Sequence, residues 1–170
     1  MSGTVPEDDS ADALKTTVLR RALKETLFVL REGSRVWAAF SCPGSAECCQ
    51  LAVTKRPPWL WPSEWAVLRA RLAREGRALP KARADGGCPF LDAEGRRCTV
   101  YEDRPLGCRT FFCQRVRGPV KLPREASTAL DDRLAALNLA VDSEAEPRSI
   151  LDWWASSVGG PGAGRHHDEP

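Results

Sequence analysis

The sequence predicts a small, mainly α-helical domain with an irregular, cysteine-rich metal-binding centre. Apolar residues recur at helical intervals on both sides of that centre, Pro and Gly interrupt residues 80–125, and all seven cysteines lie between Cys42 and Cys113. A chain of 170 residues is long enough for one domain with a modest core of its own. The cysteines are therefore expected to organise one region and not to hold the whole fold together.

We expect a single domain over residues 11–156, with the cysteine cluster at about 40–113. The first ten residues are polar and acidic, which predicts a disordered N-terminus over residues 1–10. The Gly-rich end of the chain predicts a flexible tail over residues 157–170. The two histidines lie in that tail, so they are excluded from the expected ligand set.

Helical periodicity predicts four helices. They span about 11–31, 63–75, 127–141 and 147–155. Gly33 is expected to stop the first helix, Ser63 to cap the second, and Thr128 with Asp131 to start the third in a capping-box-like arrangement. Residues 36–40 are expected to form a short extended segment or a loop, since five apolar residues do not distinguish the two.

The chain start and the composition indicate a cytoplasmic protein without a membrane or nucleic-acid partner. The N-terminus lacks the basic and apolar regions of a signal peptide, and no apolar stretch approaches the roughly 20 residues of a membrane helix. The 25 basic and 23 acidic residues are interspersed without a basic stripe. In a reducing compartment clustered cysteines more often bind metal than form disulfides, and an odd number cannot pair completely.

The thiols are the predicted metal ligands. A thiolate-rich site with no nearby histidine suits structural zinc or an iron-sulfur cluster. Side chains of adjacent residues point in different directions in most backbone conformations, so one of Cys48 and Cys49 is expected to ligate while the other packs or bridges, and Cys49 is the weaker candidate. The candidate ligands are Cys42, Cys48, Cys49, Cys88, Cys98, Cys108 and Cys113.

Three polar residues near the last cysteines are candidates for binding around the cofactor. Arg104 and Arg109 flank Cys108, where guanidinium groups would hydrogen-bond to sulfur and offset its negative charge. The alternative for both is ordinary salt bridging to neighbouring acidic residues. Tyr101 is expected either to donate to a sulfur or substrate group, or to pack half-buried with its hydroxyl at the surface.

The order of these motifs resembles the cysteine-cluster family of zinc- or iron-chelating proteins, called the YkgJ or CxxCxxCC family. Its pattern is C-x-x-C-x-x-C-C, an acidic helix start, C-P-F-L, and then C-x-hydrophobic-Y-x-x-R-P-x-x-C-R-x-F. The matching positions are Cys42, Cys48, Cys49, Glu64, Cys88 to Leu91, Cys98, Tyr101, Arg104, Pro105, Cys108, Arg109 and Phe111. One position departs from the pattern, because Ser45 replaces its second cysteine and a serine oxygen binds soft metals less well than a thiolate.

The resemblance implies a metal-binding protein that holds zinc or an iron-sulfur cluster, in a structural or redox role. Related clusters occur in a bacterial flagellin lysine methylase for which an iron-sulfur cluster is implied, which favours iron-sulfur slightly over zinc. The alternatives are a metal-dependent protein-modifying enzyme of the lysine methylase type, or an adaptor that binds a protein partner through Trp59, Trp61 and Trp65. These tryptophans equally suit packing that shields the cluster from water. No catalytic motif is found, so enzymatic activity is left undecided.

Overall fold

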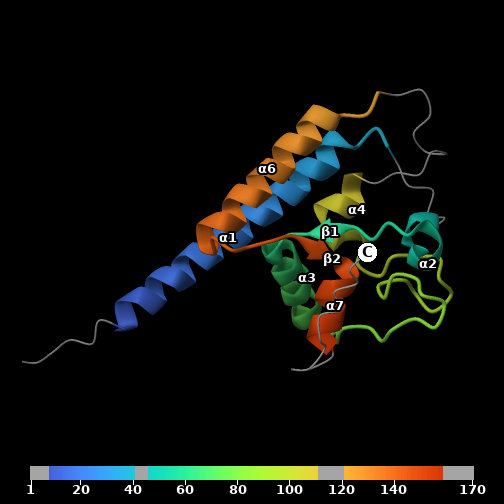
Figure 1. Ribbon diagram of the computed structural model, residues 1–170, viewed down its shortest axis with the longest axis horizontal. Coiled ribbons are helices and arrows are strands. Elements are labelled where there is room, and N and C mark those ends of the chain that lie inside the picture. Colours follow the sequence, from blue (N-terminus) through green and yellow to red (C-terminus); the bar gives the residue numbers. More distant parts are fainter. Residues whose placement is uncertain (1–7, 41–45, 111–120, 159–170) are drawn as a thin grey trace, which may run out of the picture.

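The structure, a computed structural model, describes residues 8–40, 46–110 and 121–158, and it is mainly α-helical as predicted. In Figure 1 the blue helix α1 and the orange helix α6 lie side by side as a long antiparallel pair, while the cysteine-rich loops lie at the opposite end of the molecule beside α2. The described elements are α1 (Asp8–Val36), the 3-10 helix η1 (Glu47–Cys49), α2 (Leu51–Thr54), β1 (Trp59–Leu60), α3 (Pro62–Arg74), the 3-10 helix η2 (Tyr101–Asp103), α4 (Leu106–Thr110), α6 (Arg124–Val141), β2 (Arg148–Ser149) and α7 (Ile150–Val158).

Helix α1 is longer at both ends than the sequence predicts. It includes residues 8–10, which were expected to be disordered, whereas residues 1–7 lie outside the described part of the chain. Gly33 does not stop the helix. It lies inside α1, at a position where another helix packs closely against the backbone. A Cβ built on Gly33 would lie only 2.8 Å from Leu106 Cδ1 of α4. The glycine therefore lets α4 approach α1.

The segment after α1 is a turn and not an extended strand. Val36 is the last helical residue, and Trp37 to Ala39 form the turn. Trp37 and Phe40 are buried, with their ring centroids 5.0 Å apart. The two rings pack against each other just after the end of α1. The apolar residues of this segment are thus buried by a local contact and not by pairing in a sheet.

Helices α3 and α6 are confirmed, but their predicted caps are wrong. The backbone N–H of Trp61 donates to Glu64 Oε2 at 2.8 Å, so Glu64 and not Ser63 satisfies the start of α3. Helix α6 begins at Arg124, which places Thr128 and Asp131 inside the helix. Asp131 instead accepts a hydrogen bond from Trp61 Nε1 at 3.2 Å.

A two-stranded antiparallel sheet connects the C-terminal segment to the centre of the molecule. Trp59 pairs with Ser149 and Leu60 with Arg148, so residues 148–149 are strand where a helix was predicted. Helix α7 follows and extends to Val158, which makes the first two residues of the expected tail helical. The rest of that tail, with both histidines, lies outside the described residues.

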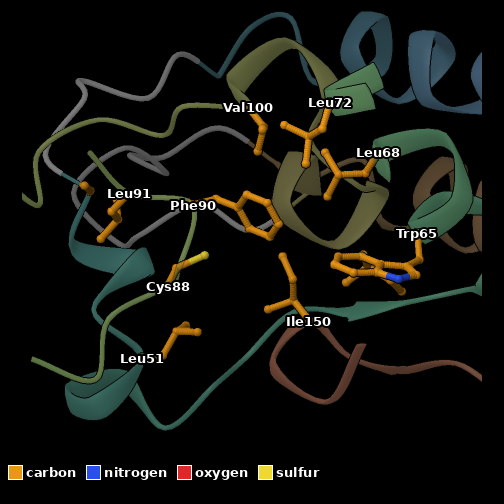
Figure 2. Packing of buried hydrophobic residues seen from close by; sticks show 11 residues of the cluster. Leu51, Trp65, Leu68, Leu72, Cys88, Phe90, Leu91, Val100 and Ile150 are labelled. Carbon is orange, nitrogen blue, oxygen red and sulfur yellow. The ribbon is translucent and has the colours of Figure 1, made fainter. Parts of the chain in front are cut away.

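Two clusters of buried residues form most of the described core. One joins α1, α3, α4 and α6 around Val29, Leu106 and Leu134. The other includes residues of the cysteine-rich loops, and Figure 2 shows Cys88 among its apolar side chains. None of the described helices is long and apolar enough to cross a membrane.

A buried polar contact joins the three long helices. The hydroxyls of Thr26 (α1) and Ser63 (α3) lie 2.9 Å apart. Asn138 (α6) donates from Nδ2 to Ser63 Oγ and accepts from the Ser63 backbone N–H, both at 2.9 Å. All three residues are buried, so each hydrogen bond satisfies a group that water cannot reach.

Replacing Asn138 by Ala is expected to lower the free energy of unfolding by about 1–3 kcal/mol, because the Ser63 N–H then lies buried without its acceptor. Urea denaturation followed by circular dichroism measures the effect. The matched control is Asp132→Ala on the exposed face of α6, which should stay within about 0.5 kcal/mol of the unmodified protein. Equal stability of both variants would contradict this role for Asn138.

Candidate metal centre

All five described cysteines line one cavity of about 590 Å³. Apolar side chains form much of its wall. The described lining residues are Ala46, Cys48, Cys49, Leu51, Arg56, Pro57, Pro58, Trp59, Cys88, Phe90, Arg96, Arg97, Cys98, Val100, Tyr101, Arg104, Pro105, Gly107, Cys108 and Ile150. The predicted ligands Cys42 and Cys113, and the departure at Ser45, lie outside the described residues.

A tight turn positions the adjacent cysteines. Ala46 adopts a left-handed conformation with φ of 52°, and Cys49 N–H donates to Ala46 O at 2.9 Å. The following 3-10 helix places Cys48 Sγ and Cys49 Sγ 3.8 Å apart. The expectation that their side chains point in different directions is therefore wrong here, because the turn folds both sulfurs toward the cavity.

Long-range backbone hydrogen bonds attach the second cysteine segment to the first. Cys88 N–H donates to Cys49 O at 2.8 Å, which ties the two cysteine-bearing segments together directly. Leu91 and Cys98 form an isolated antiparallel bridge, and Thr99 N–H donates to Phe90 O at 2.8 Å. Cys98 is thus returned to the cavity by a narrow hairpin-like turn.

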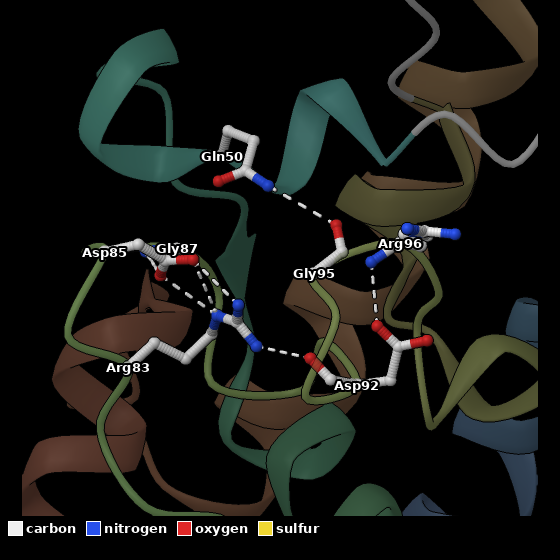
Figure 3. Close-up of polar contacts among 7 residues, drawn as sticks. All are labelled: Gln50, Arg83, Asp85, Gly87, Asp92, Gly95 and Arg96. Carbon is white, nitrogen blue, oxygen red and sulfur yellow. Dashed lines mark hydrogen bonds and ion pairs between the residues drawn. The ribbon is translucent and has the colours of Figure 1, made fainter.

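Polar contacts hold this turn from outside, as Figure 3 shows. The guanidinium of Arg83 forms an ion pair with Asp85 at 2.7 Å and donates to the carbonyl of Asp92. Gln50 Nε2 donates to Gly95 O at 3.4 Å. Gly95 has a φ of 70°, a left-handed conformation that residues with a side chain rarely adopt, and the turn requires this conformation. The irregular segment is therefore fixed by side chains, as Pro- and Gly-rich chain must be.

Glu64 links the last cysteine helix to the scaffold. Its Oε1 accepts from the Leu106 N–H at 2.7 Å and its Oε2 from the Trp61 N–H at 2.8 Å, so one carboxylate holds the starts of α3 and α4. Cys108 lies on α4, two residues after Leu106. Burial raises the pKa of Glu64 to about 7 even though both N–H groups favour the ionised form.

The thiols differ strongly in their protonation. A hydrogen bond from Cys49 lowers the pKa of Cys48 to about 7, while the same contact and burial raise the pKa of Cys49. Burial raises the pKa of Cys88 to about 11, and it also raises the pKa values of Cys98 and Cys108. Near neutral pH Cys48 is therefore the described thiol closest to ionisation, and the other four described thiols hold their protons unless a metal displaces them.

Arg104 and Tyr101 lie at the cavity, whereas Arg109 is used for packing. Arg104 stacks 3.6 Å over the ring of Tyr101. Burial raises the pKa values of Cys98 and Cys108, and the charge of Arg104 acts against that rise. Tyr101 is 41% exposed, so its ring lies at the surface beneath Arg104. The buried guanidinium of Arg109 donates to the carbonyls of Glu102 and Arg104 and to Ser34. In the described structure Arg109 positions this backbone segment and is absent from the cavity lining.

The three tryptophans have separate environments. Trp65 is buried and packs against Phe90 and Trp153. Trp61 is half-buried beside the core of the long helices. Trp59 alone lines the cavity, and it is 61% exposed. The three side chains therefore do not form one common surface, and packing accounts for Trp61 and Trp65.

Sequence reasoning missed several residues at the cavity. Arg56, Arg96 and Arg97 line it, although only the position of Arg96 and Arg97 directly before Cys98 could have drawn attention to them. Ile150 also lines it from the C-terminal segment. No local pattern predicts this, because Ile150 reaches the site through the β1 to β2 pairing.

The described donors fit a soft metal but do not surround one point. No three His, Cys, Asp or Glu side chains among the described residues are placed to hold a single ion. The donors in the described lining are thiols without a carboxylate or imidazole. This donor set suits zinc or an iron-sulfur cluster and does not suit magnesium or calcium.

Comparison with known protein families identifies the class. Residues 41–129 match the CxxCxxCC family, described as a putative zinc- or iron-chelating domain. The match covers more than half of the 170 residues, so the chain belongs to this family. This confirms the resemblance found in the motifs and supports chelation of zinc or iron, without choosing between them. Comparisons with curated proteins and with solved structures gave no match.

Glu64→Gln is expected to remove a pH dependence of stability. The folded protein holds the Glu64 proton up to a pKa of about 7, against 4.5 for an unperturbed carboxyl, so the unfolded chain releases it first as pH rises. Between pH 5 and pH 7 the stability of the unmodified protein should fall by about 2 kcal/mol relative to the variant. Urea denaturation of both proteins across this range, with Glu144→Gln as the surface control, measures the difference. Parallel pH profiles would contradict the raised pKa.

Proposed function

We propose that this protein binds an iron-sulfur cluster through thiolates in the described cavity. The observation that carries the proposal is the spread of five cysteines around about 590 Å³, with no three of them placed around one ion. A single tetrahedral zinc ion with Zn–S bonds of about 2.3 Å needs four sulfurs within about 3.8 Å of one another. A cluster distributes its ligands over several iron atoms, so it tolerates wider separations.

The surroundings of the thiols support the same proposal. Phe90, Val100 and Ile150 are buried residues that also line the cavity, so the thiols face an apolar wall. Such a wall limits the access of water to a metal centre. Arg104 supplies positive charge next to the thiols, which offsets the negative charge of several thiolates.

A zinc ion is the second candidate, and one distance favours it. The separation of 3.8 Å between Cys48 Sγ and Cys49 Sγ equals the edge of a zinc-thiolate tetrahedron. Two further thiols would have to move toward this pair to complete the site. Zinc in that arrangement would have a structural role, because it would join segments that share little regular structure.

The proposed role of the metal is structural, because it would stabilise the irregular cysteine-rich region. If the metal centre is an iron-sulfur cluster, a redox role is proposed in addition. Thiols that must stay reduced to bind metal are consistent with the cytoplasmic location expected from the sequence. The protein-modifying enzyme and the adaptor are not favoured by any contact among the described residues.

Anaerobically purified protein should contain iron and acid-labile sulfide in similar amounts and show a broad visible absorption band. Cys98→Ser and Cys108→Ser should each lower the bound iron at least twofold, because each removes a thiol that lines the cavity. Thr99→Ser is the matched control, since it leaves the thiols and retains a hydroxyl at the hydrogen bond to Phe90 O. Colourless protein with one zinc per chain would favour the second candidate, and folded protein without metal would refute both.

Metal affinity should increase steeply with pH. Cys88, Cys98 and Cys108 have raised pKa values, so they are protonated near pH 7 and must lose their protons when they bind a metal. Titration of metal-free protein with Zn²⁺ in competition with a chelator should show more than a tenfold gain in affinity per pH unit between pH 6 and pH 8, after correction for the chelator. An affinity independent of pH would show that these thiols are not ligands.

A further inference from the structure

The described lining of the cavity carries several positive charges besides the thiols. Arg56, Arg96, Arg97 and Arg104 line it, and the described lining includes no Asp, Glu or Lys. A concave surface with charged groups of one sign concentrates ligands of the opposite sign. A metal centre alone does not explain four guanidinium groups at this one cavity.

The four arginines divide into two groups. Arg104 is held by Tyr101, because its guanidinium lies 3.6 Å over the Tyr101 ring and its Nε donates to Tyr101 O at 2.9 Å. Arg56, Arg96 and Arg97 also line the cavity, and all three are exposed. We call these three residues the rim arginines.

The rim arginines are exposed and free to meet a ligand. None forms an ion pair within 4.0 Å with an acidic side chain in the described parts of the chain. The neighbouring Asp92 carboxylate accepts from the backbone N–H of Arg96 at 2.7 Å, and the charge of Arg97 is among the causes that lower its pKa, without a close ion pair to either guanidinium. The guanidinium donors at the rim thus keep their capacity for an incoming anion.

The remainder of the wall is apolar and aromatic. Pro57, Pro58 and the exposed Trp59 form one side, and the buried Leu51 and Val100 are also part of the lining. A volume of about 590 Å³ lies inside the range of roughly 300–1,000 Å³ that is typical of small-molecule sites. Apolar walls with a few charged groups at one place bind ligands that have an apolar body and a charged end.

We propose that the cavity binds a small organic anion, whose acidic oxygens meet the rim arginines and whose apolar body lies against Trp59 and the prolines. This inference rests on the proposed function in so far as the anion is the substrate or effector of the same centre. Carboxylates and phosphates share the required chemistry, since both accept paired hydrogen bonds from guanidinium groups.

The probe pair is 8-anilinonaphthalene-1-sulfonate and the uncharged N-phenyl-1-naphthylamine, which have the same aromatic body with and without an anionic group. The sulfonate should bind with one saturable site per chain and at least tenfold more tightly than the neutral compound, as measured by its fluorescence. Displacement by 1-naphthoate and by 1-naphthyl phosphate then distinguishes a carboxylate site from a phosphate site, and either result supports the proposal.

The double variant Arg56→Gln with Arg96→Gln should weaken sulfonate binding about tenfold or more, because each change removes a charge-assisted hydrogen bond. Binding of the neutral probe should stay within about twofold on the same reasoning. Arg69→Gln on the exposed side of α3 is the matched control and should change neither. Unchanged urea midpoints show that the variants are folded, as expected for exposed residues.

The outcomes separate this inference from metal binding, because iron and zinc are measured on the same samples. Bound metal with no saturable sulfonate site, or with equal binding of both probes, overturns the anion site and leaves the proposed function intact. Sulfonate binding that depends on Arg56 and Arg96 in protein that never holds metal supports the anion site and overturns the metal centre. Sulfonate affinity that is unchanged in the double variant overturns the assignment to the rim arginines.

Discussion

The buried carboxylate of Glu64 is the contact on which the arrangement of the site depends. It accepts the N–H groups of Trp61 and Leu106 at 2.8 and 2.7 Å, and so it fixes the start of α3 relative to the start of α4. Helix α3 packs on α1 and α6, whereas α4 carries Cys108. Together with the packing of Leu106 on Gly33 and the hydrogen bond from Arg109 to Ser34, this side chain positions one wall of the cavity on the helical scaffold. A buried carboxyl is costly, and its two hydrogen bonds make that burial tolerable.

The long helices form the packed scaffold of the molecule, whereas the cysteine segments carry the candidate metal ligands. The long helices α1, α3 and α6 share apolar contacts and the buried contact of Thr26, Ser63 and Asn138. The cysteine segments have only short elements, and they are held by individual hydrogen bonds such as that from Cys88 N–H to Cys49 O. Segments of this kind gain from a metal, because a bound metal adds bonds between stretches of chain that have little regular structure. The family to which the chain belongs is consistent with this division, since it is described as a chelating domain.

Three residues have tasks that local sequence rules do not predict. Gly33 was expected to end α1 by its conformational freedom, but it is required for the approach of Leu106. Ser63 was expected to cap α3, but it is buried between two other helices. Arg109 has the residue type and the position of a thiol partner, yet it binds backbone carbonyls. In each case a local rule identified a special residue, and a long-range contact that the local sequence does not contain decided its task.

The sequence by itself determined the helical class, the extent of the cysteine region, the soft donor set and the family, because these depend on periodicity, residue type and spacing along the chain. Only the tertiary structure decided which residues share the cavity. It brought the sulfurs of Cys48 and Cys49 to 3.8 Å, placed Ile150 beside thiols more than forty residues earlier, and gathered the rim arginines around an apolar wall. The physical reason is that turn conformation and strand pairing set these distances, and both are fixed by contacts between segments that are remote in the sequence.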